Sequence, residues 1–320
     1  MALKRILSID GGGIRGLIPA LILEEIERRT GTPTACLFDL IAGTSTGGIL
    51  AAGLCVPGPA QAPRYPAHDL VSLYREHGQE IFQPDPVRRI TSLFFGPQYS
   101  AKNLEKQLLE RFGETRLADA VTGLLITSFE MHQGQAWFFS REIARKQPDR
   151  NFLLREIARA TSAAPTYFAP ARIAGADGKN VVLVDGGVFA NNPTMCAWVD
   201  DHEGVQGSDN VMVLSIGCGS VPHSASYRHA RRWGRVSWAQ PVIGAFLDGQ
   251  ADTVDYQMRQ LLDASRYLRL QVDLPVENGA MDDASAPNVR ALALAASRLL
   301  DDPEIDRRLT DFCRRLEAVS

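Results

Sequence analysis

Three glycine-rich stretches, each directly after a short apolar run, constrain the fold of this chain more than any other feature. They are DGGGIRG at 10–16, GTSTG at 43–47 and DGG at 185–187. The apolar runs have the length of β-strands, and helical patterns follow the first two stretches. Glycine permits the tight turns and the close backbone approach that such positions require. We therefore expect a sheet with chemistry-bearing turns collected at one edge.

Short apolar runs alternate with helical patterns from residue 4 to about 217, which favours an α/β fold with a largely parallel sheet covered on both faces. The expected strands are 5–9, 38–43, 123–129, 136–140, 181–184 and 211–217, and the expected helices are 17–29, 45–54, 69–77, 100–111, 152–160 and 191–203. Sites in such sheets form at the carboxyl ends of the strands. The three glycine-rich stretches are expected to meet there.

Residues 218–320 form a mostly helical C-terminal extension in this interpretation, with a strand-like YLRLQV at 267–272. The last helix is marked by Pro303 in its first turn after Asp302, and by an apolar face. We expect a single domain over 1–320, with a catalytic core at about 4–217.

Charge and composition exclude several classes of function. A formal net charge of −3 gives no electrostatic case for nucleic acid as a partner. The five cysteines lack paired spacing, which disfavours a disulfide framework and a zinc site, so we expect neither metal nor cofactor. No apolar run approaches the ~20 residues of a membrane span, and the first strand leaves no room for a signal peptide. We expect a cytoplasmic protein, and the sequence does not indicate an oligomeric state.

GTSTG fits the G-x-S-x-G pattern of a nucleophilic serine on a strand-to-helix turn. Small residues at Gly43 and Gly47 would avoid clashes around the turn, and the following helix would direct its positive end at a developing negative charge. The sequence therefore predicts Ser45 as a nucleophile. The alternative is that these glycines only permit close packing.

DGGGIRG would expose backbone N–H groups at a helix start, where they serve an oxyanion or a phosphate. Gly11, Gly13 and Gly16 also fit the dinucleotide fingerprint G-x-G-x-x-G, which requires an acidic residue at the end of the second strand. Asp39 has roughly the right separation but begins its strand. It should therefore lie at the wrong end of the sheet.

Asp185 stands at the end of an apolar strand, followed by Gly186 and Gly187, where a catalytic base is expected. Its alternative role is to cap a turn or the helix near Asn191. No histidine follows a strand with glycine support; the six are His68, His77, His132, His202, His223 and His229. We predict a dyad in which Asp185 takes the proton of Ser45. An ordinary aspartate has a pKa of ~3.9, so Asp185 must be desolvated or closely coupled to the serine.

These motifs in this order resemble those of the patatin-like phospholipases, including bacterial members, and ATSAAPTYFAP at 160–170 is similar to a further family segment. The resemblance covers about 4–217. It implies a three-layer α/β/α fold and a Ser-Asp dyad that acts on acyl esters of lipids. The implied oxyanion hole is built from N–H groups of Gly11, Gly12 and Gly13. Arg15 matches the family's arginine, which would steady that loop or face a lipid phosphate, unless it forms a surface salt bridge.

The leading hypothesis is a phospholipase A or lysophospholipase with a phospholipid or another acyl-ester lipid as substrate. An acyltransferase that uses the same serine, and a nucleotide sensor that uses GGGIRG, are the alternatives. Peripheral membrane contact is a further hypothesis, because Phe94 and Phe95 fall in a loop and four arginines surround Trp233. The alternative there is that the aromatic residues pack into the core.

Overall fold

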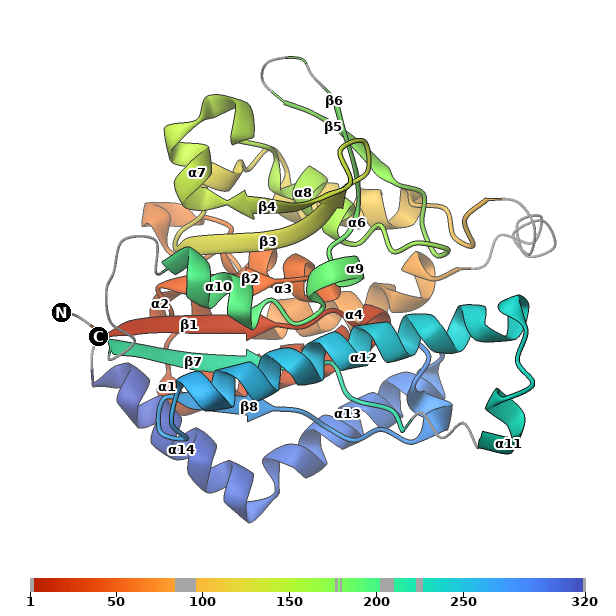
Figure 1. Ribbon diagram of the computed structural model, residues 1–320. Coiled ribbons are helices and arrows are strands. Elements are labelled where there is room, and N and C mark those ends of the chain that lie inside the picture. Colours follow the sequence, from red (N-terminus) through yellow and green to blue (C-terminus); the bar gives the residue numbers. More distant parts are fainter. Residues whose placement is uncertain are drawn as a thin grey trace.

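The fold is a central β-sheet between two layers of helices, as Figure 1 shows for the computed structural model of the chain. The structure describes residues 3–83, 96–175, 178, 180–201, 210–222 and 227–318, without the side chains of 201, 229 and 235–243. This three-layer α/β/α arrangement is the fold class that the sequence predicts. Among the helices of the described residues, none is long and apolar enough to cross a membrane.

In the described residues, eight strands form one sheet in the order β5-β6-β3-β2-β1-β7-β8, and β4 also pairs with β3. The strands are β1 Lys4–Ile9, β2 Leu40–Gly43, β3 Gly123–Glu130, β4 Gln135–Ser140, β5 Ala171–Ala174, β6 Asn180–Asp185, β7 Val211–Ile216 and β8 Tyr267–Leu270. The pairs from β3 through β2, β1 and β7 to β8 are parallel, whereas β3–β4, β3–β6 and β5–β6 are antiparallel. Every expected strand is present, with shifted ends.

Asp185 does not follow a parallel strand, so the expectation that all three glycine-rich stretches do so is wrong. β6 runs antiparallel to β3, because β5, which the sequence analysis did not predict, pairs with β6 as a preceding antiparallel strand. Asp185 pairs with Ser128 of β3, whereas Gly43 at the end of β2 pairs with Ile126. β6 therefore ends two residues beyond the level at which β2 ends. Asp185 reaches the expected edge of the sheet from the opposite direction.

Helices cover both faces of the sheet. The larger apolar core involves α1 Leu17–Thr30, α2 Thr34–Leu37, α3 Thr46–Leu54, α4 Ala67–Ile81, α6 Lys102–Phe112, α7 Arg141–Lys146, α8 Leu154–Thr161, α13 Ala286–Leu300 and α14 Pro303–Glu317. The smaller core lies under α10 Thr194–Asp201 and α12 Arg235–Leu261. Shorter helices are α9 Gly187–Ala190 and α11 Tyr227–Ala230, with 3-10 turns at Gly13–Gly16, Pro59–Gln61, Leu117–Asp119, Pro148–Arg150 and Val276–Asn278. Every expected helix is present, again with shifted ends.

Strand β1 presents different side chains to the two faces. Leu7 and Ile9 are fully buried in the larger core. Ser8 and Asp10 alternate with them, so they lie on the face that α10 and α12 cover, and they are buried polar residues. Ser215 of β7 pairs with Ser8 and is also fully buried. This face of the sheet is therefore polar toward the carboxyl ends of its strands.

The C-terminal extension continues the same sheet. β8 pairs in parallel with β7, where YLRLQV predicted a strand. Helices α13 and α14 pack against α1. The predicted apolar face of α14 is buried at Leu309, Phe312 and Leu316, and the side chain of Asp302 accepts two backbone N–H groups of its first turn. The extension therefore supplies both an outer strand and part of the larger core.

Candidate active site

Ser45 lies on a sharp turn between β2 and α3, with φ 56° and ψ −124°. This is backbone that non-glycine residues rarely adopt, and it is typical of strained functional positions. A Cβ on Gly43 would lie 2.2 Å from the Gly47 carbonyl oxygen, and a Cβ on Gly47 would lie 2.2 Å from that of Ile9. Both glycines of G-x-S-x-G are therefore required by the packing of the turn itself.

Thr161 holds the backbone of this turn in place. The Ser45 N–H donates to Thr161 Oγ1 at 2.8 Å, and the Thr161 hydroxyl donates to the carbonyl of Thr127 at 2.7 Å. Thr161 is fully buried at the end of α8. The motif ATSAAPTYFAP contains this threonine, but the sequence alone predicted no role for it. Its place within that motif is the signal that could have identified it.

Asp185 is the acidic group that lies beside Ser45. Its residue is 4% exposed, and burial raises the pKa of its carboxyl to about 7. Hydrogen bonding to Ser45 and to the N–H of Gly187, 2.7 Å from Oδ1, opposes this rise because it favours the ionised form. A Cβ on Gly186 would lie 2.1 Å from Thr127 Oγ1, so the strand end is tightly packed. The structure thus brings together the two residues that the sequence predicts as a dyad.

The glycine-rich loop after β1 lies beside the same turn. A Cβ on Gly11 would lie 3.2 Å from the Cβ of Ser45. The N–H of Gly11 donates to the carbonyl of Asn191 at 3.0 Å, so it is engaged within the protein. In the described residues, no backbone or side-chain acceptor takes the N–H groups of Gly12 and Gly13. These two N–H groups remain as donors for a ligand.

Gly12 and Gly13 have no room for side chains. A Cβ on Gly12 would lie 2.4 Å from Cys218 Cβ, and one on Gly13 would lie 2.1 Å from the carbonyl oxygen of Met281. Gly13 also has φ +61°, in the left-handed region that favours glycine. Cys218 and Met281 therefore pack tightly against the loop, and its two glycines can offer a ligand only their backbone groups.

Arg15 contacts this loop from within the protein, as a loop-steadying role would require. The residue is 6% exposed; its Nε donates to the carbonyl of Gly12 at 3.4 Å and its Nη1 to that of Gly219 at 3.3 Å. Within the described residues it forms no ion pair, so it is not the surface salt bridge that we considered. The guanidinium joins the glycine-rich loop to the segment that follows β7.

Ser45 and Asp185 both line a cavity of about 310 Å³. The other lining residues are mostly apolar and come from α3, α4, α6, the segment after α8, and α12; they include Ile49, Leu73, Ile81, Leu104, Phe168 and Phe246. Gly12 and Gly13 also line it. An apolar cavity beside a serine, a carboxyl group and unpaired N–H groups can hold an alkyl chain next to a reactive ester.

No histidine of the described residues lines this cavity. His68 contacts Glu24 at 2.6 Å on the surface, His77 lies 3.5 Å from Glu80, and His132 is exposed. His202, His223 and the side chain of His229 lie outside the described residues, as do Phe94 and Phe95.

Asp39 lies at the opposite edge of the sheet from the glycine-rich loop. It pairs there with Arg5, with Oδ1 2.9 Å from Nη2 and Oδ2 3.1 Å from Nε. The carboxylate is thus at the amino end of β2, far from a ribose that DGGGIRG would hold. This arrangement opposes the dinucleotide interpretation.

Comparisons with known proteins agree with the sequence motifs. A family model described as "Patatin-like phospholipase" matches residues 7–198. Patatin-like protein 2 of Oryza sativa subsp. indica is 36% identical over 338 residues, which cover 92% of this chain and 83% of that protein. Patatin-T5 of Solanum tuberosum is 33% identical over 336 residues, covering 93% and 86%. The crystal structure of VipD from Legionella pneumophila covers 94% of this chain and 67% of its own, at 13% identity and a TM-score of 0.45.

Proposed function

Because this chain belongs to the patatin-like phospholipase family, we propose that it is a lipid acyl hydrolase with Ser45 as nucleophile and Asp185 as general base. The observation that carries this proposal is the position of Ser45, on a strained turn beside a buried carboxyl group, in an apolar cavity. The expected substrates are phospholipids or lysophospholipids, whose ester carbonyl can reach the serine while the acyl chain enters the cavity.

The reaction proceeds through an acyl-enzyme. Ser45 Oγ attacks the ester carbonyl carbon while its proton passes to Asp185. The N–H groups of Gly12 and Gly13 then stabilise the oxyanion of the tetrahedral intermediate. As the ester C–O bond breaks, the leaving alcohol takes the proton from Asp185. A water molecule then attacks the acyl-enzyme, gives its proton to Asp185, and releases the fatty acid, with the proton returning to Ser45.

The pKa of Asp185 supports its role as base. A general base works best when its pKa lies near the working pH, and burial raises the pKa of Asp185 to about 7. An aspartate with its ordinary pKa of ~3.9 would be a weak base for the hydroxyl of a serine. Burial therefore supplies what a histidine supplies in a Ser-His-Asp triad.

Covalent labelling tests the proposal directly. A fluorophosphonate should phosphonylate Ser45 Oγ with loss of fluoride, and peptide mass mapping should find the label at this residue. Ser45→Ala should abolish both labelling and hydrolysis of a phospholipid or a short-chain ester, at an unchanged melting temperature. Labelling at another residue, or an active Ser45→Ala variant, would show that the assignment is wrong.

The acyltransferase alternative keeps the same acyl-enzyme but replaces water by an alcohol. Product analysis separates the two, since a hydrolase yields free fatty acid at the same rate when an acceptor alcohol is added. The nucleotide-sensor alternative predicts binding of NAD or common nucleotides to DGGGIRG. The pairing of Asp39 with Arg5 favours the hydrolase over this alternative.

We also propose that the protein meets lipid surfaces at the carboxyl edge of the sheet. Figure 1 shows α11 and the first half of α12 extending beyond the ends of β7 and β8. Arg228, Arg231 and Arg232 are exposed there, and Phe246 of α12 lines the cavity while 58% exposed. Cationic side chains beside an exposed aromatic residue suit an anionic membrane.

A further inference from the structure

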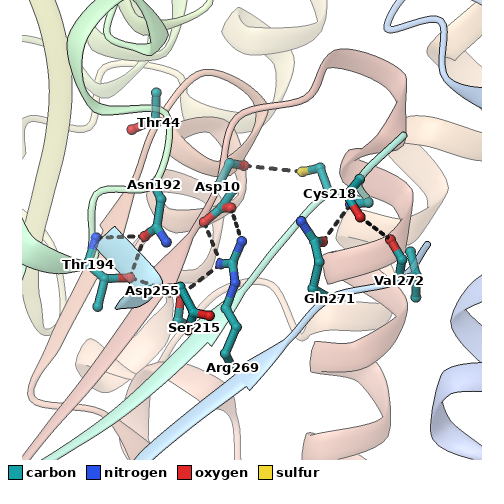
Figure 2. A network of polar contacts seen from close by, with 12 residues as sticks. Asp10, Thr44, Asn192, Thr194, Ser215, Cys218, Asp255, Arg269, Gln271 and Val272 are labelled. Carbon is teal, nitrogen blue, oxygen red and sulfur yellow. Dashed lines mark hydrogen bonds and ion pairs between the residues drawn. The ribbon is translucent and has the colours of Figure 1, made fainter. Parts of the chain in front are cut away.

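A buried ion pair joins the C-terminal extension to the first residue of the glycine-rich loop (Figure 2). Arg269 Nη1 donates to Asp10 Oδ1 at 2.9 Å and Arg269 Nη2 to Asp10 Oδ2 at 2.5 Å. The side chains are 6% and 3% exposed. Arg269 lies on β8, outside the residues 7–198 that the family model matches. Two parallel hydrogen bonds of this kind fix the orientation of the carboxylate as well as its position.

The backbone of Asp10 is in turn tied to the end of β7 and to the segment that follows it. Its N–H donates to the carbonyl of Ile216 at 3.0 Å, and its carbonyl accepts from the thiol of Cys218 at 3.2 Å. Cys218 packs directly against Gly12. A displacement of Asp10 would therefore move the two N–H donors that follow it in the chain.

Arg269 has a second connection to the loop. Its Nη1 also donates to Ser215 Oγ at 2.8 Å, and that oxygen lies 2.9 Å from Thr194 Oγ1. The Thr194 hydroxyl is hydrogen-bonded to Asn192 Oδ1 at 2.5 Å. The neighbouring Asn191 accepts the N–H of Gly11. The chain of contacts thus reaches the loop from its far side.

Asp10 rather than Asp255 is the two-oxygen partner of Arg269. Asp255 of α12 contributes to the charge around Arg269, but its Oδ1 accepts from the Tyr267 hydroxyl at 2.9 Å. Its Oδ2 accepts from Arg259 Nε at 2.9 Å. The guanidinium therefore stands between two carboxylates and donates both of its terminal nitrogens to the one that begins the loop.

We propose that Arg269 is a positioning residue for the oxyanion donors. It holds Gly12 and Gly13 through Asp10, and it holds Gly11 through Ser215, Thr194 and Asn192. This inference rests on the proposed function, because it requires the Gly12 and Gly13 N–H groups to bind an oxyanion. Glycine residues have no side chains with which to fix their own position, so a loop of three consecutive glycines depends on the groups around it.

A second ion pair on the same strand provides a matched control. Arg5 of β1 pairs with Asp39 through two contacts at the amino edge of the sheet, five residues before Asp10. Removing Arg5 also breaks an arginine–aspartate pair, between β1 and the residue before β2, but leaves the glycine-rich loop untouched. The Arg5–Asp39 pair is the more exposed of the two, with side chains 12% and 30% exposed, so kcat and inhibitor affinity are compared per folded molecule.

The test compares Arg269→Met, Arg269→Lys and Arg5→Met with the wild-type enzyme on a soluble thioester. A trifluoromethyl ketone serves as the probe of the oxyanion site, because Ser45 adds to its carbonyl carbon and leaves an oxyanion where the intermediate has one. Arg269→Met should lower kcat by about a hundredfold with KM nearly unchanged, in the range seen when an oxyanion donor is lost. The inhibition constant of the ketone should rise in parallel.

Arg269→Lys should recover about a tenth of the wild-type kcat, because an ammonium keeps the charge without the two parallel hydrogen bonds. Asp10→Asn should match Arg269→Met, and the double variant should be no worse, since both break one unit. Arg5→Met should change kcat and ketone affinity by less than about twofold, whatever its melting temperature.

Unchanged kcat and ketone affinity in folded Arg269→Met would overturn the proposal, as would equal losses in Arg5→Met. Where Arg269→Met does not fold, Arg269→Lys and Ser215→Ala decide by the same two measurements, and normal values in both overturn it. A wild-type enzyme that neither turns over the thioester nor binds the ketone would instead contradict the proposed function. The two failures are therefore distinguishable.

Discussion

The two faces of the sheet differ most where they flank the glycine-rich loop. Toward α3, α4 and α6, the loop borders a cavity whose wall is mainly aliphatic and aromatic. Toward α10 and the second half of α12, the loop begins at Asp10, which pairs with Arg269 beside Ser215; all three side chains are buried but polar. The first side thus offers an apolar cavity with few hydrogen-bonding groups. The second offers hydrogen bonds and an ion pair in a closely packed interior.

This difference shows how the fold separates binding from alignment. An apolar wall accepts an alkyl chain in many positions, because dispersion and hydrophobic contacts are nearly independent of direction. Hydrogen bonds and ion pairs weaken steeply with angle and distance, so they hold a backbone in one geometry. The proposed donors of Gly12 and Gly13 lie between these two environments. Asp185 is the exception, as a carboxyl group buried at the apolar cavity.

The largest effect on turnover should come from removing the charge of Asp185. Asp185→Asn keeps the shape but cannot accept the Ser45 proton, so turnover should fall by about a thousandfold. In the wild type, activity should decline as the pH falls through about 7, because the protonated carboxyl is no longer a base. Pre-steady-state ester hydrolysis between pH 5 and 9 measures both. Near-normal activity in folded Asp185→Asn would place the base elsewhere, and alanine variants of His68, His77 and His132 would then be compared.

The same substitution should raise stability above neutral pH. The pKa of Asp185 is raised on folding, so its contribution to stability is fully present below the ordinary pKa of ~3.9 and is lost as the pH rises from there through about 7. A shift of that size corresponds to at most about 4 kcal/mol. Asp185→Asn should therefore melt higher than the wild type at pH 8 and at nearly the same temperature below pH 4, where the carboxyl is mostly protonated in both states. Equal melting curves at pH 8 would mean that burial of the ionised Asp185 carboxylate does not destabilise the folded protein.

A change to the apolar wall should alter selectivity while leaving the polar network intact. Leu104→Trp places a larger side chain from α6 in the cavity, so long acyl chains should lose about tenfold in kcat/KM relative to short ones. Leu109 lies on the same helix and is 51% exposed, so Leu109→Trp is the matched control. A series of esters from butyrate to palmitate gives the comparison. An unchanged chain-length profile in Leu104→Trp would show that the acyl chain lies elsewhere.

The smallest effect concerns the outer rim beside α11. Each of Arg231→Glu and Arg232→Glu should weaken binding to anionic vesicles by at least about fivefold, since losing an arginine near the surface alone removes about 1 kcal/mol. Arg298→Glu on α13 makes the same charge change at another exposed position. Sedimentation with phosphatidylserine-containing and neutral vesicles measures the difference. An equal loss of vesicle binding in Arg298→Glu would show that the effect depends on net charge and that the residues beside α11 do not form a docking site.

Sequence alone predicted which residues lie together at the edge of the sheet better than it predicted the directions of the strands that carry them. Ser45 follows a parallel strand, and local patterns predicted both the strand and the turn. Asp185 reaches the same edge on an antiparallel strand, because β5 precedes it as a hairpin partner. β5 has four residues, ARIA, which carry too little pattern to be recognised. Whether the two residues act as the predicted dyad remains for the variants above to decide.

The polar side of the loop could not be predicted from local sequence. Arg269 alternates with apolar residues in YLRLQV, and this pattern is equally typical of an outer strand with a solvated arginine. Its partner lies 259 residues earlier in the chain. Thr161 and Ser215 are ordinary residues of their elements until the fold brings them to the turn and the loop.

β8 is an edge strand of the sheet, and it is synthesised long after the glycine-rich loop that it contacts. Arg269 follows Asp10 in the chain by 259 residues. At elongation rates of about 5–20 residues per second, that interval lasts roughly 13–50 s. During this time the nascent chain lacks the arginine that we propose positions the glycine-rich loop. A chain that has not yet reached β8 therefore cannot form the buried ion pair at Asp10.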